Sequence, residues 1–115
     1  SIEQLNLENS LRKAIFRDEF VVHYQPKLHL ATNRIVGVEA LVRWNHPTLG
    51  LLYPSEFIPL SEETGLVSAI GELVMDKACR QAQMWKEAGL GNIHTAVNIP
   101  ALNLVLWMTA MMYWR

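Results

Sequence analysis

The run from Ile35 to Trp44 most constrains what this chain can fold into. It is rich in β-branched and apolar residues and is the longest strand candidate in the sequence. Because side chains alternate along a strand, Glu39, Leu41 and Arg43 share one face, while the residues between them are apolar. The run therefore predicts a strand with one apolar face and one face that carries a carboxylate and a guanidinium.

The segments around this run complete an α/β pattern. Strand, hairpin, long helix and strand is the order of a unit in which a crossover helix returns the chain to a parallel neighbouring strand. The first expected elements are a helix over residues 5–15, a strand over 20–25 that Pro26 ends or places at a sheet edge, and a hairpin turn over 31–34 with Asn33 in the left-handed conformation. A loop over 45–53 and a short helix over 54–58, which Pro59 limits, follow. The last expected elements are a long helix over 66–88 capped at Gly89 and a strand over 93–99.

Length and charge exclude several classes of protein. With 115 residues the chain has room for one domain, and its 10 Lys and Arg against 11 Asp and Glu give a net charge of -1. This balance disfavours a DNA- or RNA-binding protein, which needs a basic surface. The single cysteine, Cys79, permits no internal disulfide and fits a reducing cytoplasm. No apolar run is long enough for a membrane span, and the start at Ser1 predicts a domain taken from a larger protein.

Two side chains on the predicted strands are candidate metal ligands. An ionised Glu39 within an apolar strand is costly unless a cation offsets it, although the same carboxylate can lie at a solvated edge. Asn98 ends the last predicted strand, where ligands gather in α/β folds, but it can also serve as a turn residue before Pro100. Together they offer two oxygen ligands, which suit Mg²⁺ or Mn²⁺ better than zinc. Gln25 is either a ligand contact or a partner of free backbone groups.

The C-terminal residues 101–115 differ in kind from the rest. They contain no acidic residue and one base, and they hold three of the five Met and two of the four Trp. A segment that is apolar on every side needs another surface to bury against. We therefore expect residues 101–115 to pack against other parts of the chain or against a second copy.

Several ordered motifs over residues 8–100 closely resemble the first half of the EAL domain, the family of bacterial phosphodiesterases that hydrolyse cyclic di-GMP. The name refers to the tripeptide Glu39-Ala40-Leu41. The motifs are Tyr24-Gln25-Pro26-Lys27, the run over residues 35–44, His46-Pro47, Gly50, the stretch from Pro54 to Leu66, and Ala96-Val97-Asn98-Ile99. Their combination and order, more than the tripeptide, carry the resemblance.

The resemblance implies a fold, a reaction and a set of site residues. The fold would be a TIM-like β/α barrel of EAL type with an early antiparallel strand, and the reaction a metal-dependent hydrolysis of cyclic di-GMP to linear pGpG. Glu39 and Asn98 match metal ligands, so that Mg²⁺ or Mn²⁺ is the implied cofactor. Gln25, Leu41 and Arg43 match positions that contact the nucleotide, with Arg43 toward a phosphate.

The resemblance covers only part of the family's domain. A complete barrel needs roughly 250 residues, and the acidic and lysine residues of the family's second half do not follow Asn98 in this sequence. We therefore predict a partial barrel over residues 1–100 and an apolar tail without family resemblance over 101–115. The chain would be related to cyclic di-GMP phosphodiesterases of the bacterial cytoplasm but inactive by itself. The alternative is a non-catalytic module that binds cyclic di-GMP or a protein, completed by a homodimer through residues 101–115.

Overall fold

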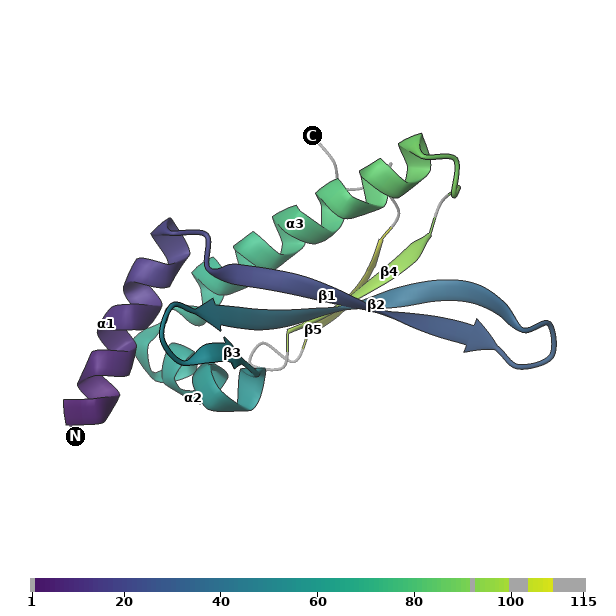
Figure 1. Ribbon diagram of the computed structural model, residues 1–115. Helices are drawn as coiled ribbons and strands as arrows, with labels where there is room; N and C mark the ends of the chain where they lie inside the picture. Colours follow the sequence, from purple (N-terminus) through teal and green to yellow (C-terminus); the bar gives the residue numbers. More distant parts are fainter. Residues whose placement is uncertain (1, 92, 100–103, 109–115) are drawn as a thin grey trace.

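A computed structural model of the chain contains one mixed sheet with three helices packed on it (Figure 1). It describes residues 2–91, 93–99 and 104–108. In the described chain the strands lie in the order β1-β2-β4-β5, and β3 pairs with β2. The elements are α1 (Ile2–Phe16), β1 (Phe20–His29), β2 (Arg34–His46), β3 (Gly50–Leu52), α2 (Pro54–Thr64), α3 (Val67–Glu87), β4 (His94–Ile99) and β5 (Leu104–Met108).

The sheet topology confirms the predicted α/β unit. Strands β1 and β2 form an antiparallel hairpin, and Asn33 in its turn has a φ of 55°, the left-handed conformation expected of it. Strand β4 pairs with β2 in parallel, and α2 and α3 lie in the connection between these two strands. The fold is therefore one β/α unit preceded by an antiparallel strand, the arrangement expected for part of a β/α barrel with an early antiparallel strand.

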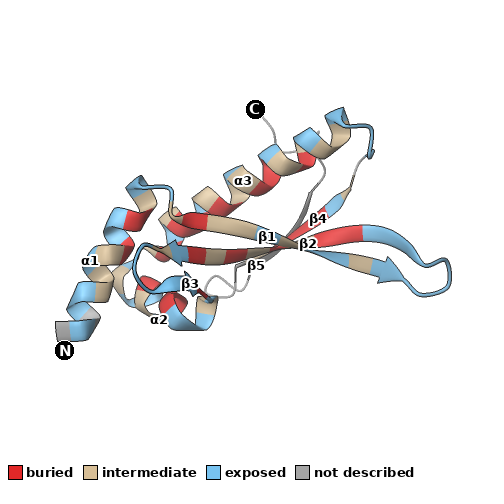
Figure 2. Cartoon of the chain, viewed as in Figure 1, coloured by how far each residue is buried: buried red, intermediate tan, exposed pale blue. Residues whose placement is uncertain are grey.

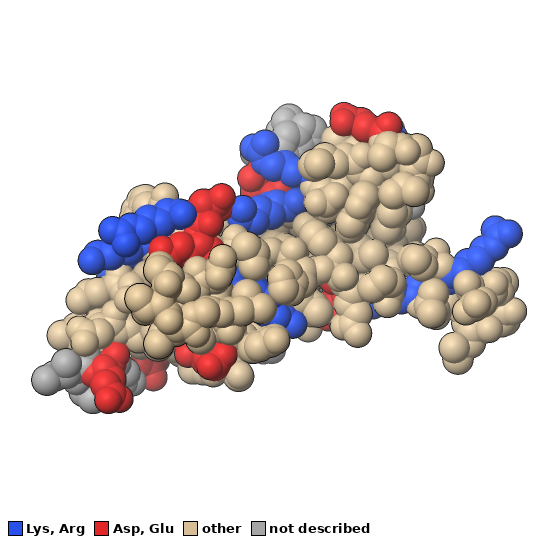
Figure 3. Space-filling model, viewed as in Figure 1, with Lys and Arg blue, Asp and Glu red and all other residues tan. Residues whose placement is uncertain are grey.

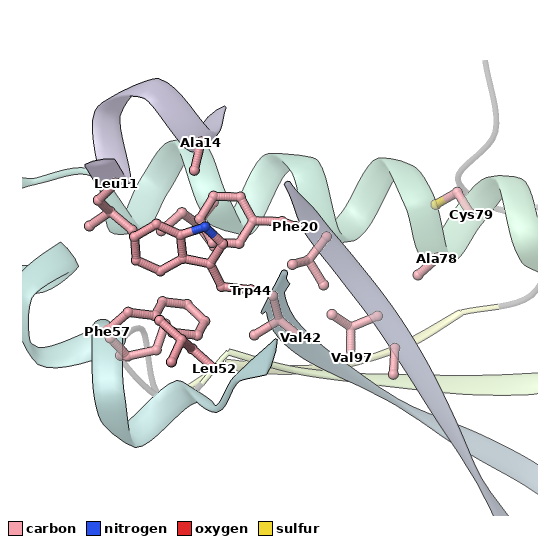
Figure 4. Packing of buried hydrophobic residues seen from close by; sticks show 14 residues of the cluster. Leu11, Ala14, Phe20, Val42, Trp44, Leu52, Phe57, Ala78, Cys79 and Val97 are labelled. Carbon is pink, nitrogen blue, oxygen red and sulfur yellow. The ribbon is translucent and has the colours of Figure 1, made fainter. Parts of the chain in front are cut away.

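The apolar face of β2 packs against the helices. Along this strand Val38, Ala40, Val42 and Trp44 are buried, and they alternate with side chains that are only partly buried (Figure 2). Trp44 lies at the centre of an aromatic group, with ring centroids 5.7 Å from that of Phe20 and 5.8 Å from that of Phe57. Figure 4 shows this group between residues of α1, α2 and the sheet. Burial of these side chains supplies the main free energy that holds the layers together.

Helix α3 spans the sheet and follows the predicted long helix closely. Its buried positions recur at helical spacing and include Ile70, Val74 and Ala78. The helix ends at Glu87, and Gly89 adopts a φ of 87°, so the expected glycine lies just past the C-cap.

Three elements extend well beyond the sequence prediction, each because of its surroundings in the fold. Strand β1 continues through Pro26, which is tolerated because β1 lies at the edge of the sheet. Helix α2 continues past Pro59 to Thr64, because Phe57, Ile58 and Ser61 are buried on both sides of the proline. The predicted loop over residues 45–53 contains β3, three residues that pair antiparallel with the end of β2.

Part of the apolar C-terminal segment extends the sheet. Strand β5 pairs antiparallel with β4, with Asn98 opposite Val105 and Ile99 opposite Leu104. Residues 101–103 and 109–115, which complete the predicted tail, lie outside the described part of the chain. The boundary predicted after residue 100 stays a prediction.

Candidate functional site

The candidate site lies on the face of β2 opposite the helix-packed core. Glu39, Leu41 and Arg43 are each partly buried and share this face, as the alternation predicted. The same strand thus presents a continuous apolar surface to the helices and three chemically different side chains on its other side.

Strand pairing brings two more of the predicted site residues to this face. Gln25 of β1 is the direct cross-strand partner of Glu39, so their Cβ atoms lie about 5 Å apart. On the other side of β2, Glu39 pairs with Ala96 of β4, and Asn98 lies two residues further along β4. One strand spacing and two residue rises place the backbones of Glu39 and Asn98 about 8 Å apart.

The Arg43 guanidinium is held by two contacts. Its Nη1 donates a hydrogen bond of 2.8 Å to the carbonyl oxygen of Val42. Its central carbon lies 4.7 Å from the centroid of the Tyr53 ring, which is a cation–π contact. The Arg43 Nε is shielded from water and has no hydrogen-bond acceptor within the described residues. A guanidinium fixed in this way is oriented before any ligand arrives.

Tyr53 is the site residue that sequence reasoning did not find. It follows β3, whose last residue, Leu52, pairs with Trp44 of β2, and this pairing carries Tyr53 alongside Arg43. Because the sequence predicted a loop where β3 lies, no periodicity in the sequence indicated that these two side chains would meet.

The oxygen atoms of Glu39 and Asn98 fit part of a Mg²⁺ or Mn²⁺ site. A carboxylate and an amide carbonyl are the hard ligands that these ions prefer. Within the described residues, no group of three or more His, Cys, Asp or Glu is placed to hold a metal ion. Glu39 and Asn98 would therefore supply two ligands, and water or other groups would have to supply the rest.

Two residues with reactive side chains outside this face, His46 and Cys79, have environments that fit a structural role. His46 Nδ1 accepts hydrogen bonds of 3.1 Å from the backbone N–H groups of Thr48 and Leu49, which fixes the turn after β2. Cys79 is buried in α3, and burial, with a smaller effect of Asp76, raises the pKa of its thiol. A raised pKa disfavours the thiolate that a nucleophile needs.

The surface shows mixed charge. Acidic and basic side chains both appear along the face seen in Figure 3, and basic side chains also extend from the projecting hairpin. Within the residues that the structure describes, no helix is long and apolar enough to cross a membrane.

Comparison with known proteins identifies the class to which this fold and site belong. The sequence profile of the EAL domain matches residues 8–106. The chain therefore belongs to the EAL domain family, as its motifs predicted.

Curated relatives show which proteins carry similar sequences. The chain is 49% identical over 100 residues to the bifunctional diguanylate cyclase/cyclic di-GMP phosphodiesterase MucR of Pseudomonas aeruginosa, a match that covers 87% of this chain and 15% of that protein. It is 42% identical over 102 residues to the cyclic di-GMP phosphodiesterase NbdA of the same organism, covering 89% of this chain and 13% of that protein. The chain thus spans a small part of the length of these relatives.

Solved structures match the fold. The cyclic di-GMP complex of the PaMucR phosphodiesterase gives a TM-score of 0.77 at 47% identity and covers 81% of this chain and 38% of that chain. The EAL domain of Xanthomonas citri FimX in complex with cyclic di-GMP gives a TM-score of 0.71 at 29% identity, covering 83% of this chain and 36% of that chain. The described fold corresponds to a part of such a domain.

Proposed function

We propose that this chain forms the part of an EAL domain that binds cyclic di-GMP and contributes metal ligands for its hydrolysis to linear pGpG. The observation that carries the proposal is the shared face of β1, β2 and β4, on which Gln25 pairs with Glu39, Asn98 lies two residues beyond the β4 partner of Glu39, and Arg43 lies four residues further along β2. The cyclic di-GMP phosphodiesterases among its relatives, both from a bacterium, support this substrate. We place the chain in the bacterial cytoplasm, where its single cysteine stays reduced.

Each side chain on this face has a role that suits its chemistry. The Arg43 guanidinium binds a phosphate through charge-assisted hydrogen bonds. The Gln25 amide and the Leu41 side chain contact the nucleotide, one by hydrogen bonding and the other by apolar contact. Glu39 and Asn98 bind Mg²⁺ or Mn²⁺, which would neutralise phosphate charge and activate water when bound.

Calorimetric titration of the chain with cyclic di-GMP, with and without Mg²⁺, tests the proposal. We expect Arg43→Ala to weaken binding more than tenfold, the effect of losing a charge-assisted hydrogen bond of roughly 2 kcal/mol. Arg12→Ala is the matched control, because Arg12 is exposed on α1 and pairs there with Glu8. Equal affinities for the Arg43 and Arg12 variants would reject the role of Arg43.

The same titration distinguishes the contribution of Mg²⁺ to the affinity from the contribution of the direct nucleotide contacts. We expect Glu39→Gln to abolish the gain in affinity that Mg²⁺ gives and to leave the affinity measured without Mg²⁺ nearly unchanged, because the amide keeps the shape of the side chain but loses its charge. A Mg²⁺ effect that survives this substitution would show that Glu39 is not a ligand.

We further propose that residues 1–115 alone do not hydrolyse cyclic di-GMP. Two ligands from Glu39 and Asn98 do not hold the two metal ions of such a reaction. Chromatographic detection of pGpG after incubation with Mg²⁺ or Mn²⁺ tests this, and turnover that Glu39→Ala abolishes would overturn it.

A second candidate function is a non-catalytic module that pairs with its own copy. Strand β5 extends the sheet beyond β4 within the tail of residues 101–115, and strands at a sheet edge can pair with another chain. In this case a homodimer through the tail would complete the core and bind cyclic di-GMP or a protein without hydrolysis. Light scattering during size-exclusion chromatography decides, since a monodisperse monomer contradicts the dimer.

A further inference from the structure

The aromatic ring beneath Arg43 is the unassigned feature that bears most directly on the site. Tyr53 lies in the connection between β3 and α2, and half of its surface, 51%, is exposed. It belongs to neither the metal-ligand pair nor the predicted nucleotide contacts. Its ring nevertheless faces the guanidinium that the proposed function places on a phosphate, with the Arg43 central carbon 4.7 Å from the ring centroid.

The surroundings of Arg43 explain why the ring matters. Nη1 is directed to the Val42 carbonyl oxygen, and Nε is removed from water without an acceptor in the described residues. A cationic group that has lost water on one side is costly to hold in place. The negative face of an aromatic ring offsets part of this cost, because it attracts the cation electrostatically.

The backbone of Tyr53 is itself fixed. Its N–H donates a hydrogen bond of 2.8 Å to Oε2 of Glu56 at the start of α2, and its φ of -96° and ψ of 159° are ordinary extended values. Because this hydrogen bond uses only the backbone of Tyr53, the side chain can be replaced without breaking it. Tyr53 thus offers Arg43 a ring whose position is set by β3 on one side and by α2 on the other.

We propose that Tyr53 is a positioning residue that holds the Arg43 guanidinium in the orientation in which it binds a phosphate of cyclic di-GMP. This inference rests on the proposed function of Arg43 and assigns that function a second residue. Without the ring, Arg43 regains rotamer freedom and water, and binding must then supply the cost of orienting it again.

A pair of substitutions separates the ring from the hydroxyl group. We expect Tyr53→Leu to weaken binding of cyclic di-GMP about threefold, the size of effect that a partly exposed cation–π contact supports. Tyr53→Phe keeps the ring and should bind like the unchanged chain. A loss of similar size in both variants would assign the effect to the hydroxyl group and overturn the proposal.

A double-mutant cycle with Arg43→Ala distinguishes positioning from direct contact. If Tyr53 acts through Arg43, Tyr53→Leu has no further effect on affinity once Arg43 is removed. If the two effects add, Tyr53 contacts the nucleotide itself and the proposal is wrong. If Arg43→Ala alone leaves affinity unchanged, the proposed function of Arg43 fails. A loss with Arg43→Ala and none with Tyr53→Leu rejects the positioning role only.

A spectroscopic measurement without nucleotide completes the test. The Nε–H resonance of Arg43, assigned by its disappearance in Arg43→Ala, reports the ring contact directly by nitrogen NMR. We expect it to shift and to exchange faster with water in Tyr53→Leu, and to stay in place in Tyr53→Phe. An unchanged resonance in Tyr53→Leu would show that the ring does not hold the guanidinium.

Discussion

Successive side chains of β2 point to opposite faces of the sheet, and the two faces have different surroundings. On the helix side Val38, Ala40, Val42 and Trp44 are buried and belong to the core or border it. On the other side Glu39, Leu41 and Arg43 are partly buried and lie outside the core cluster. Burial therefore distinguishes the residues that stabilise the fold from the residues that can take part in binding. Measurements of the free energy of unfolding can test this distinction.

Trp44→Ala should give the largest difference in the free energy of unfolding between a substitution on the helix-packed face and one on the opposite face. Trp44 is fully buried against Phe20 and Phe57, and its indole N–H donates a 3.0 Å hydrogen bond to Oε1 of Glu19. We expect the free energy of unfolding to fall by about 3–5 kcal/mol, the usual cost of removing a large aromatic residue from a core.

Urea denaturation followed by circular dichroism measures this change. Arg43→Ala, one position earlier on the opposite face, is the control and should lower the free energy of unfolding by less than about 1 kcal/mol. If the two variants unfolded at the same urea concentration, the two faces would not differ in their contribution to stability, and the prediction would be wrong.

A smaller difference in the free energy of unfolding is expected between Val42→Ala and Leu41→Ala, which change adjacent residues on opposite faces. Val42→Ala removes two carbons from a side chain that is 5% exposed, and should cost about 2 kcal/mol. Leu41→Ala removes three carbons from a side chain outside the core cluster, and should cost less than about 1 kcal/mol. The expected order is opposite to the order of side-chain size, so a greater loss from Leu41→Ala in denaturant titrations would contradict it.

The last effect is confined to alkaline pH and concerns Tyr24, which extends the helix-packed face onto β1. Tyr24 pairs with Ala40, its ring lies 5.0 Å from that of Trp85, and burial, with a smaller effect of Cys79, raises its pKa from 10.0 to about 12. Between these values the unfolded chain loses the phenolic proton while the folded chain keeps it. We therefore expect a contribution to stability that is fully present below pH 10 and is lost as the pH rises toward about 12.

Unfolding curves of the unchanged chain and of Tyr24→Phe over this alkaline range provide the measurement. The variant lacks the ionisable group, so its free energy of unfolding should fall less steeply with pH. Parallel pH profiles of the two proteins would contradict the raised pKa of Tyr24.

The sequence predicted those parts of the fold that local patterns determine. The alternation along residues 35–44, the left-handed turn at Asn33 and the glycine after α3 each follow from the preferences of a few neighbouring residues. The family motifs likewise identified the membership that the profile over residues 8–106 shows. These features needed no knowledge of distant contacts.

The remaining features depend on tertiary contacts. Strand β3 has only three residues and forms because β2 offers it a hydrogen-bonding edge. Helix α2 extends beyond Pro59, where Leu60 packs against the core and the buried Ser61 hydroxyl donates a hydrogen bond to the Ile58 carbonyl oxygen. The contact between Arg43 and Tyr53 follows from both the strand and the helix, and so it was absent from the predicted site. The predicted roles of Gln25, Glu39, Leu41, Arg43 and Asn98 remain to be tested by binding.

The parallel pairing of β2 with β4 also bears on the order in which the molecule folds. Gln25 and Glu39 lie on a hairpin whose strands are joined by a short turn, whereas Asn98 reaches Glu39 only after the chain has closed a connection that contains β3, α2 and α3. Closing a long connection costs chain entropy before its contacts form, and parallel pairing is slow for that reason. We expect the two candidate metal ligands to meet late in folding, after the β1–β2 hairpin has formed, so that the proposed pair of ligands would be the last part of the candidate site to assemble.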